Sequence, residues 1–358
     1  MTLNHPDRLF PNDPSTRAIA REIFCGVENL PIISPHGHCD PSWFSQNQRF
    51  PDPAKLFVVP DHYVFRMLVS QGISMAELGI EPVDDSKFEA DPKKIWRKFT
   101  KSYHLFRGTP TAMWLDYSFE KVFGLTEPLT VKNGEFYFDC IEEKLSEPDF
   151  LPRALFDQFN IEVLATTDPA LSKLEHHNAL RSCSWGGRVI PTYRPDSIID
   201  PEYIGFKKNL ERLGELTGED VGSWEGYKEA HRSRRLFFRE MGATATDHGH
   251  PSARTENLSS AEAEQLFHII VSGEFSPEQA EVFRAQMLTE MAKMSCEDGL
   301  VMQIHPGSRR NHSTKIFSQF GLDKGFDIPG RTDYVSALRP LLDVVGLRTD
   351  VTIILFTL

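Results

Sequence analysis

Residues 30–40 read Leu30-Pro31-Ile32-Ile33-Ser34-Pro35-His36-Gly37-His38-Cys39-Asp40, an apolar run followed at once by polar side chains. The apolar half has the length and composition of a buried β-strand. Such runs, alternating with helices, are typical of parallel α/β proteins, whose sheets are covered on both faces. Reactive residues in these folds lie at the carboxyl ends of the strands. The segment therefore predicts a strand whose end carries a functional site.

Five further apolar runs recur along the chain, and four of them lead into polar motifs. The runs are residues 161–165 before Thr-Thr-Asp, 188–191 before Thr-Tyr-Arg-Pro-Asp, 243–246 before Asp-His-Gly-His, 300–304 before His-Pro-Gly-Ser-Arg-Arg-Asn, and 351–358 at the end of the sequence. Together with the first run they predict six buried parallel strands separated by helical segments.

Helix signals are clearest before the fifth strand. Residues 276–279 (Ser-Pro-Glu-Gln) offer an N-cap serine, a proline at the first helical position and a glutamine at the third. Apolar side chains then repeat at helical spacing, and Gly299 ends the pattern; the repeat consists of Phe283, Met287, Met291 and Met294. We interpret this stripe as core packing against a sheet, because its spacing is that of one buried helix face.

Residues 41–160 separate the first predicted strand from the second, which is too long for an ordinary connection in an α/β fold. The stretches 53–79 and 96–117 are rich in aromatic residues and have helical periodicity. We therefore divide the chain into residues 1–40 with the first strand, a helical insert over 41–160, and residues 161–358 with strands two to six and their covering helices.

The composition favours small-molecule chemistry. The chain has 358 residues, 40% of them hydrophobic, and its 39 Lys and Arg against 51 Asp and Glu give a net charge of −12. The basic residues are scattered, so neither a nucleic-acid surface nor an anionic membrane surface is expected. The five cysteines form no CxxC pair, and no signal segment or membrane span is evident. We expect a cytoplasmic protein, with the oligomeric state, a homo-oligomer included, left open.

His36-Gly37-His38 is the sharpest chemical signal. Residues two apart in an extended chain project to the same side, so both imidazoles can converge on one ion, and the intervening glycine lets the backbone approach it. Imidazole nitrogen suits zinc and other first-row divalent metals. The sequence therefore predicts a metal site with His36 and His38 as ligands, the alternative being two histidines that are solvated or satisfied in the core.

The later strand ends supply complementary groups. Arg194 after the third strand can hold a carboxylate through two parallel hydrogen bonds, although an ion pair with Asp196 is the alternative. Asp247 and His248 after the fourth strand can serve as acid, base or ligand, and His305 after the fifth can be a ligand or polarise the substrate. If the strands close into a barrel, these side chains face one rim together with the first two histidines.

Two other histidine-containing motifs are less decisive. Asp61-His62-Tyr63 lies in the insert, where Asp61 is a good N-cap and the two rings are either functional or simply neighbours of the cap. Residues 175–177 (Glu-His-His) follow the second strand, and we interpret them as a solvated helix face.

Six motifs in this order resemble uronate isomerase, a mononuclear member of the amidohydrolase superfamily. They are SPHGHCDP (34–41), PDHYVFRML (60–68), TTDPALSKLEHH (166–177), PTYRPD (191–196), TDHGH (246–250) and MQIHPGSRRN (302–311). The resemblance spans essentially the whole chain and implies a (β/α)8 TIM barrel of the metal-dependent hydrolase type with a helical insert after strand 1. It also implies that the chain as given lacks strands 7 and 8, because family members continue beyond the position of Leu358.

The resemblance implies isomerisation of D-glucuronate to D-fructuronate and of D-galacturonate to D-tagaturonate, with one bound Zn²⁺ or another divalent metal. Each matching position then has an implied role. The metal ligands would be His36 and His38; the residues reaching the substrate from the insert would be His62 and Tyr63; Arg194 would grip a substrate oxygen or carboxylate; and Asp247, His248, His305 and Arg310 would line the site. The doublet Arg309-Arg310 leaves open which arginine faces the site.

An aldose–ketose shift needs an acid, a base and a cation where charge develops on oxygen, and these residues can supply all three. Two alternatives remain. A mononuclear metal-dependent hydrolase of the same superfamily would use the same ligands, whereas a binuclear one is disfavoured because residues 243–247 contain no lysine. A non-catalytic sugar-acid-binding fragment would bind the uronate without turnover.

Overall fold

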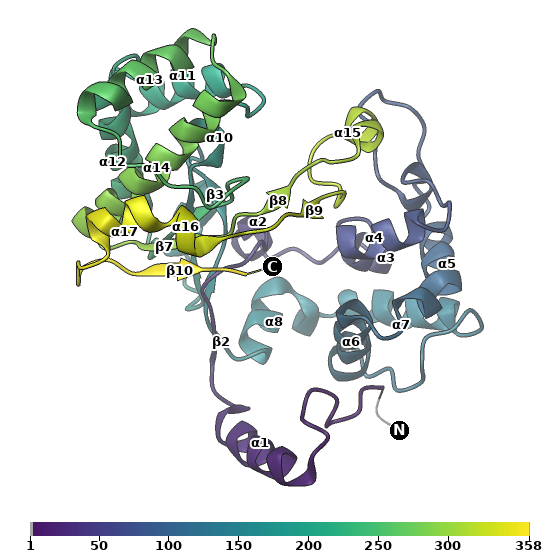
Figure 1. Cartoon of the computed structure of the whole chain (residues 1–358). Helices are drawn as coiled ribbons and strands as arrows, with labels where there is room; N and C mark the ends of the chain where they lie inside the picture. Colours follow the sequence, from purple (N-terminus) through teal and green to yellow (C-terminus); the bar gives the residue numbers. More distant parts are fainter. Residues whose placement is uncertain (1–2, 358) are drawn as a thin grey trace. The chain divides into compact units, whose positions relative to one another are not determined.

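The computed structural model describes residues 3–357, which form two compact units. One unit comprises the described part of Met1–Ile32 together with Asn47–Asn160 and Arg310–Asp327. The other comprises Ile33–Gln46, Ile161–Arg309 and the described part of Ile328–Leu358. Figure 1 traces the chain through both. We call them the helical unit and the sheet unit.

The helical unit is built around buried aromatic side chains. Its helices are α1 (Pro14–Val27), α3 (Pro53–Phe57), α4 (His62–Val69), η1 (Ala76–Leu78), α5 (Pro92–Ser102), η2 (Tyr103–Phe106), α6 (Pro110–Tyr117), η3 (Ser118–Val122), α7 (Gly134–Leu145), η4 (Pro148–Phe150), α8 (Pro152–Gln158) and α15 (Thr314–Phe320). Trp96, Phe99, Phe119 and Phe138 are fully buried at its centre. The buried Trp96 indole donates a hydrogen bond to the Gly134 carbonyl (2.7 Å), as a buried indole N–H requires. Apart from α1 and α15, these helices lie within residues 41–160, and the assignment of that range as one insert stays a prediction.

The strands of the sheet unit are β1 (Ile32–Ser34), β2 (Ile161–Ala165), β3 (Asp168–Pro169), β4 (Arg188–Ile190), β5 (Tyr193–Arg194), β6 (Ala245–His248), β7 (Val301–Ile304), β8 (Ser308–Arg309), β9 (Ile328–Pro329) and β10 (Ile353–Leu355). Six of these strands, β1, β2, β4, β6, β7 and β10, overlap the six predicted runs, and four further two-residue strands were not predicted. In the described residues the strands form a three-stranded sheet (β1-β2-β4), a five-stranded sheet (β10-β7-β6-β5-β3) and a short antiparallel pair (β8-β9).

The pairings determined within the two larger sheets are parallel, as predicted. The α/β class with parallel sheets is therefore confirmed. Closure of these strands into one barrel is a further step that stays a prediction.

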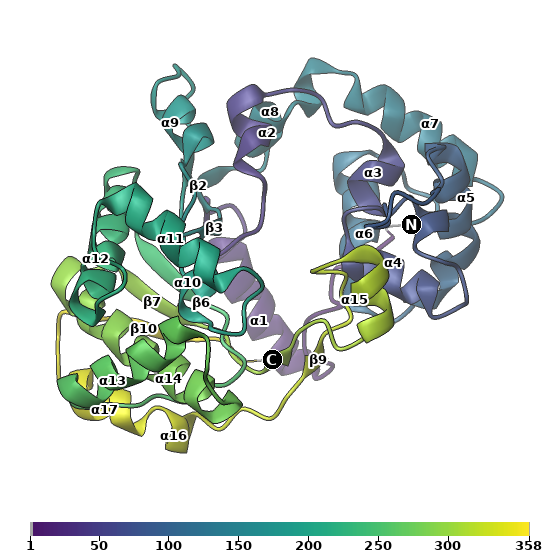
Figure 2. The same cartoon turned by 90° about the horizontal axis from the view of Figure 1, so that it is seen from above.

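Helices flank the strands within the sheet unit, as Figure 2 shows for α10 to α14 beside β6 and β7. The helices of this unit are α2 (Pro41–Gln46), α9 (Glu175–Arg181), α10 (Asp196–Ile199), α11 (Phe206–Thr217), α12 (Trp224–Glu240), α13 (Ser260–Ser272), α14 (Pro277–Asp298), α16 (Tyr334–Ala337) and α17 (Arg339–Val345). Within the described residues 3–357, no helix is both long enough and apolar enough to cross a membrane.

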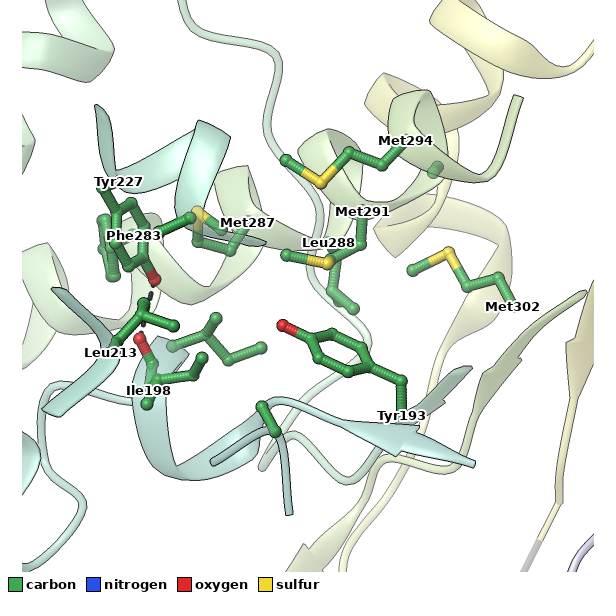
Figure 3. Close-up of a cluster of buried hydrophobic side chains, with 14 of the residues drawn as sticks. Tyr193, Ile198, Leu213, Tyr227, Phe283, Met287, Leu288, Met291, Met294 and Met302 are labelled. Atoms are coloured by element: carbon green, nitrogen blue, oxygen red, sulfur yellow. Dashed lines mark hydrogen bonds between the residues drawn. The ribbon is translucent and has the colours of Figure 1, made fainter. Parts of the chain in front are cut away.

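Helix α14 begins and ends as its sequence predicts. Ser276 and Gln279 form a reciprocal capping box, Pro277 occupies the first turn, and Gly299 ends the helix in the left-handed region at φ 76°. The predicted stripe is buried, with Phe283, Met287, Met291 and Met294 at 1% exposure or less, and it packs around Tyr193 and Met302 (Figure 3). Burying each large apolar side chain contributes roughly 1.5–3 kcal/mol, so this face holds α14 onto the sheet.

The register of β6 and β7 fixes where the polar side chains emerge. Asp247 is paired with Gln303 and His248 with Ile304. Because neighbouring strands in register point their paired side chains to the same face, Asp247 and Gln303 share one face of the sheet, and His248 points to the other. This alternation determines which predicted residues can meet.

Candidate active site

Asp247 lies at the centre of a polar cluster in the sheet unit. It is fully buried in β6. Its Oδ1 lies 2.7 Å from His305 Nε2 and 3.5 Å from His36 Nδ1, and its Oδ2 lies 3.5 Å from Arg194 Nη1. Neither carboxylate oxygen has a hydrogen bond of good geometry among the described residues. A buried carboxylate normally finds a donor or a cation, so this one is arranged to interact with something besides its protein neighbours.

Arg194 is held in place by its own strand end. Its Nε donates to Asp196 Oδ2 (2.8 Å), and Asp196 Oδ1 accepts from the Gly249 backbone N–H (3.2 Å). Burial would raise the pKa of Asp196, but the charge of Arg194 and the neighbouring His250 outweigh it, so the pKa lies below its usual range. The ion pair between Arg194 and Asp196, which was the alternative interpretation, is therefore present, and anchoring of a substrate carboxylate by Arg194 stays a prediction.

Gly249 is required by close packing at this point. A Cβ there would lie 2.6 Å from Arg194 Nη2, 2.8 Å from Asp196 Oδ2 and 2.9 Å from His305 Cε1. These distances are shorter than real Cβ contacts, so a side chain at this position would push the guanidinium or the imidazole away. The glycine lets the ends of β5, β6 and β7 converge.

The His36-Gly37-His38 segment follows β1 and is braced from β2. Thr167 Oγ1 donates to the Gly37 carbonyl (2.9 Å), and a Cβ on Gly37 would lie only 2.9 Å from the Ala165 carbonyl oxygen. The rings of His36 and His38 lie 5.0 Å apart between centroids, and the His36 and His305 rings 5.6 Å apart. Gly37 is thus needed because any side chain at this position would clash with the neighbouring strand.

Two imidazoles of this region, His38 and His248, have lowered pKa values. Partial loss of solvent lowers the pKa of His38, and the nearby His36 and Arg194 act in the same direction. Burial, with a smaller contribution from His250, lowers the pKa of His248 well below its usual range. Neutral rings keep a lone pair for a hydrogen bond or a metal.

His248 is separated from the cluster by the alternation of β6. Its Nε2 lies 3.0 Å from Thr246 Oγ1, on the face of the strand opposite Asp247. The structure therefore brings together His36, His38, Arg194, Asp247 and His305, and it places His248 behind them.

The residues predicted to bind a metal carry suitable donor atoms, but these atoms are not arranged around one point in the structure. Within residues 3–357, no three His, Cys, Asp or Glu side chains are arranged to hold a metal ion. The donors are nevertheless those that zinc prefers: two imidazoles and a buried carboxylate without a hydrogen bond. His36 and His38 thus fit the group by the type of their donor atoms.

The remaining predicted residues belong to the helical unit. His62 and Tyr63 begin α4, where Asp61 caps the helix as predicted by accepting from the Tyr63 N–H (2.7 Å). The Arg66 guanidinium lies over the Tyr63 ring, 5.0 Å from its centroid, and Tyr63 is exposed.

The arginine doublet divides between the two units. Arg309 is exposed in β8 of the sheet unit. Arg310 begins the last segment of the helical unit and lies 3.6 Å from Asp323. Which of the two faces a substrate stays a prediction.

One interpretation of the sequence was wrong. His177 is not on a solvated face but buried, with Nε2 2.8 Å from Thr166 Oγ1, which in turn donates to Asp168 (2.7 Å). Burial lowers the pKa of His177 to about 4 and raises that of Asp168 to about 6. The signal that could have indicated this contact was Thr-Thr-Asp at the end of the second strand, a polar motif to which the sequence assigned no partner.

A parallel α/β fold that gathers imidazole, carboxylate and guanidinium groups at adjacent strand ends defines an enzyme with a polar active site. A sequence profile described as glucuronate isomerase matches residues 14–358. The uronate isomerase of Mesorhizobium japonicum is 55% identical over 358 residues, which is 100% of this chain and 76% of that protein. The uronate isomerase of Rhizobium meliloti is 55% identical over 353 residues, which is 99% of this chain and 75% of that protein.

Comparison with solved structures also finds uronate isomerases. The crystal structure of glucuronate isomerase from Caulobacter crescentus superposes with a TM-score of 0.96 at 54% identity, over 99% of this chain and 74% of that one. The crystal structure of uronate isomerase from Thermotoga maritima superposes with a TM-score of 0.88 at 26% identity, over 98% of this chain and 75% of that one. The chain belongs to the glucuronate isomerase family.

Proposed function

We propose that this protein is an aldose–ketose isomerase that converts D-glucuronate to D-fructuronate and D-galacturonate to D-tagaturonate. The observation that carries the proposal is the convergence of His36, Arg194, Asp247 and His305 in the sheet unit of a chain from this family. The isomerisation moves a proton between C2 and C1 through an enediolate, so it requires proton acceptors, proton donors and positive charge close together.

Arg194 is the proposed anchor for the anionic substrate. Its guanidinium already contacts two carboxylates, Asp196 and Asp247. Because Asp196 engages Nε, the guanidinium plane is fixed and its Nη edge can bind a carboxylate or hydroxyl oxygen of the sugar. An arginine held in this way loses little side-chain freedom on binding.

Asp247 and His305 are the proposed site of proton transfer. Asp247 Oδ1 and His305 Nε2 lie 2.7 Å apart, so a carboxylate and an imidazole are held close together, which suits a reaction that removes a proton from one carbon and returns it to the next. Burial of Asp247 excludes water that would compete for that proton. His248, His62, Tyr63 and Arg310 remain predicted participants from the family resemblance.

His36 and His38 are the proposed ligands of one Zn²⁺ or another divalent metal. Such an ion supplies Lewis-acid polarisation of a carbonyl oxygen. The lowered pKa of His38 keeps its ring neutral and able to coordinate. We also infer that the parallel strands belong to a (β/α)8 barrel with residues 41–160 as a helical insert, in which the carboxyl ends of the strands would form the active-site rim.

The test is an assay of the full chain with each uronate, with and without added zinc, beside a panel of esters and lactones. We expect ketose formation from at least one uronate, lowered about 100-fold by R194M and retained in R212M, which removes an exposed arginine from α11. Ester hydrolysis without ketose formation would favour the mononuclear hydrolase instead. Binding of glucuronate without any turnover would leave only a sugar-acid-binding role.

A further inference from the structure

Gln303 makes two hydrogen bonds that together determine which ring nitrogen of His36 carries the hydrogen. It is buried in β7, and its side chain extends to the segment that follows β1. Its Nε2 donates to the Pro35 carbonyl oxygen (3.0 Å), and its Oε1 lies 3.1 Å from His36 Nδ1.

The hydrogen-bonding groups of Pro35 and His36 allow only one orientation of the Gln303 amide. The Pro35 carbonyl can only accept, so the end of the Gln303 amide that faces it must be the NH₂ group. The other end is then the oxygen, which can only accept, and His36 Nδ1 must carry the hydrogen. Asp247 Oδ1 lies 3.5 Å from the same nitrogen but makes no hydrogen bond of good geometry with it, so Gln303 is the acceptor that selects the tautomer. The remaining nitrogen, Nε2, therefore holds the lone pair.

We propose that Gln303 is a positioning residue that fixes the Nδ1–H tautomer of His36 and so presents Nε2 to the metal ion. The proposal rests on the metal-assisted isomerase proposed above. The side chain also ties the Pro35 backbone to β7, so the amide sets both the tautomer and the orientation of the ring. Partners that orient a ligating histidine typically change metal affinity by about 10- to 100-fold when they are removed.

Three variants separate positioning from packing. Q303M keeps a long side chain but removes both hydrogen bonds. Q303E keeps an acceptor opposite His36 Nδ1. Q286M is the matched control, because Gln286 is equally buried in the same unit, at 1% exposure, and also makes two hydrogen bonds, accepting from Leu258 N–H and donating to Glu290.

The measurement is long-range ¹H–¹⁵N correlation NMR on zinc-free protein labelled at its 13 histidines, at about pH 8, above the ordinary histidine pKa. H36N identifies the His36 signals by their loss. We expect a protonated Nδ1 and an unprotonated Nε2 in the wild type, Q303E and Q286M, and a mixture of tautomers in Q303M. Zinc titration should show affinity about 10- to 100-fold weaker in Q303M and close to wild type in Q286M.

A wild-type His36 with its proton on Nε2 would overturn the proposal, and this spectrum needs no variant to fold. A Q303M protein with the wild-type tautomer and zinc affinity would also overturn it. The tautomer is read without substrate, so a wild type that carries the Nδ1–H form but lacks isomerase activity would count against the proposed function alone.

Discussion

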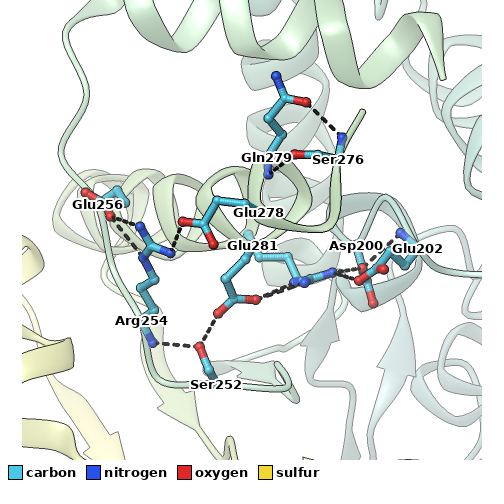
Figure 4. Close-up of polar contacts among 10 residues, drawn as sticks. Asp200, Glu202, Ser252, Arg254, Glu256, Ser276, Glu278, Gln279 and Glu281 are labelled. Atoms are coloured by element: carbon cyan, nitrogen blue, oxygen red, sulfur yellow. Dashed lines mark hydrogen bonds and ion pairs between the residues drawn. The ribbon is translucent and has the colours of Figure 1, made fainter. Parts of the chain in front are cut away.

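The buried Arg284 guanidinium joins carboxylates from two segments of the sheet unit, and replacing it tests how much that ion cluster contributes to stability. Arg284 lies on α14 at 5% exposure. Its Nη1 lies 2.6 Å from Asp200 and 2.8 Å from Glu202, and its Nη2 lies 2.8 Å from Glu281 (Figure 4). Glu281 also accepts from Ser252 in the loop after β6. The cluster thus connects α14 to two loops of the unit.

We expect R284M to lower the free energy of unfolding by roughly 3 kcal/mol. Removing one partner of a buried ion pair costs about 3–5 kcal/mol, because the others stay desolvated without compensation. The lower end applies because the Glu202 side chain is 50% exposed and can regain water, whereas Asp200 and Glu281, at 25% and 21%, regain less.

Arg254 provides the matched control, since it also contacts two carboxylates, Glu256 and Glu278 (Figure 4). Its side chain is 37% exposed, so R254M should cost less than about 1 kcal/mol, a loss that vanishes in high salt. Urea unfolding together with hydrogen exchange of the α14 amides measures both variants. Equal losses in R284M and R254M, or a loss below about 1 kcal/mol in R284M, would refute the argument from burial.

Four further outcomes follow from the described contacts. R194M should lower kcat/KM for uronates by about 100-fold in a ketose-formation assay, with R212M unchanged. Chelation should abolish that activity and added zinc restore it in the wild type but not in H38N, which atomic-absorption analysis should show to be metal-poor. Burial lowers the pKa of His231 from 6.5 to about 3. As the pH falls, the unfolded state therefore binds a proton at this histidine before the folded state does. The stability that the neutral, buried His231 contributes is complete above pH 6.5 and has fallen by about 1.4 kcal/mol at pH 5.5. Urea titrations at pH 7.5 and 5.5 should show a loss of stability that is about 1.4 kcal/mol smaller in H231N than in the wild type. S276A should destabilise α14 by about 1 kcal/mol through loss of its capping box, measured by the same hydrogen exchange.

The six longer strands were predictable because each is a short apolar run, which is visible in the sequence without knowledge of its neighbours. Their burial was predicted wrongly at β1 and β10, where Ile32, Ile33, Ile354 and Leu355 are exposed. The helix signals of α14 were predictable for a similar reason, since its cap and stripe are local. The two-residue strands β3, β5, β8 and β9 were not predicted. Each has only two residues, at least one of them polar or a proline, so no apolar run marks it in the sequence.

Tertiary contacts explain the error at the site. Residues 175–177 have a polar sequence, and only the fold reveals that His177 fills a buried position beside Thr166. His248 and Asp247 are adjacent in β6 and therefore face opposite sides of the strand, and a catalytic role for His248 stays a prediction.

Gln303 shows most clearly why part of a site is invisible in a sequence. A glutamine among apolar residues has no chemistry that marks it as functional, so neither spacing nor composition distinguishes it from Gln286 in α14. Its role follows only from register: pairing with Asp247 places it on the face toward His36, and contact with the Pro35 carbonyl decides which end of its amide is the acceptor. Residues that react can be recognised by type, whereas residues that orient them are recognised only when the direction of each hydrogen bond is known.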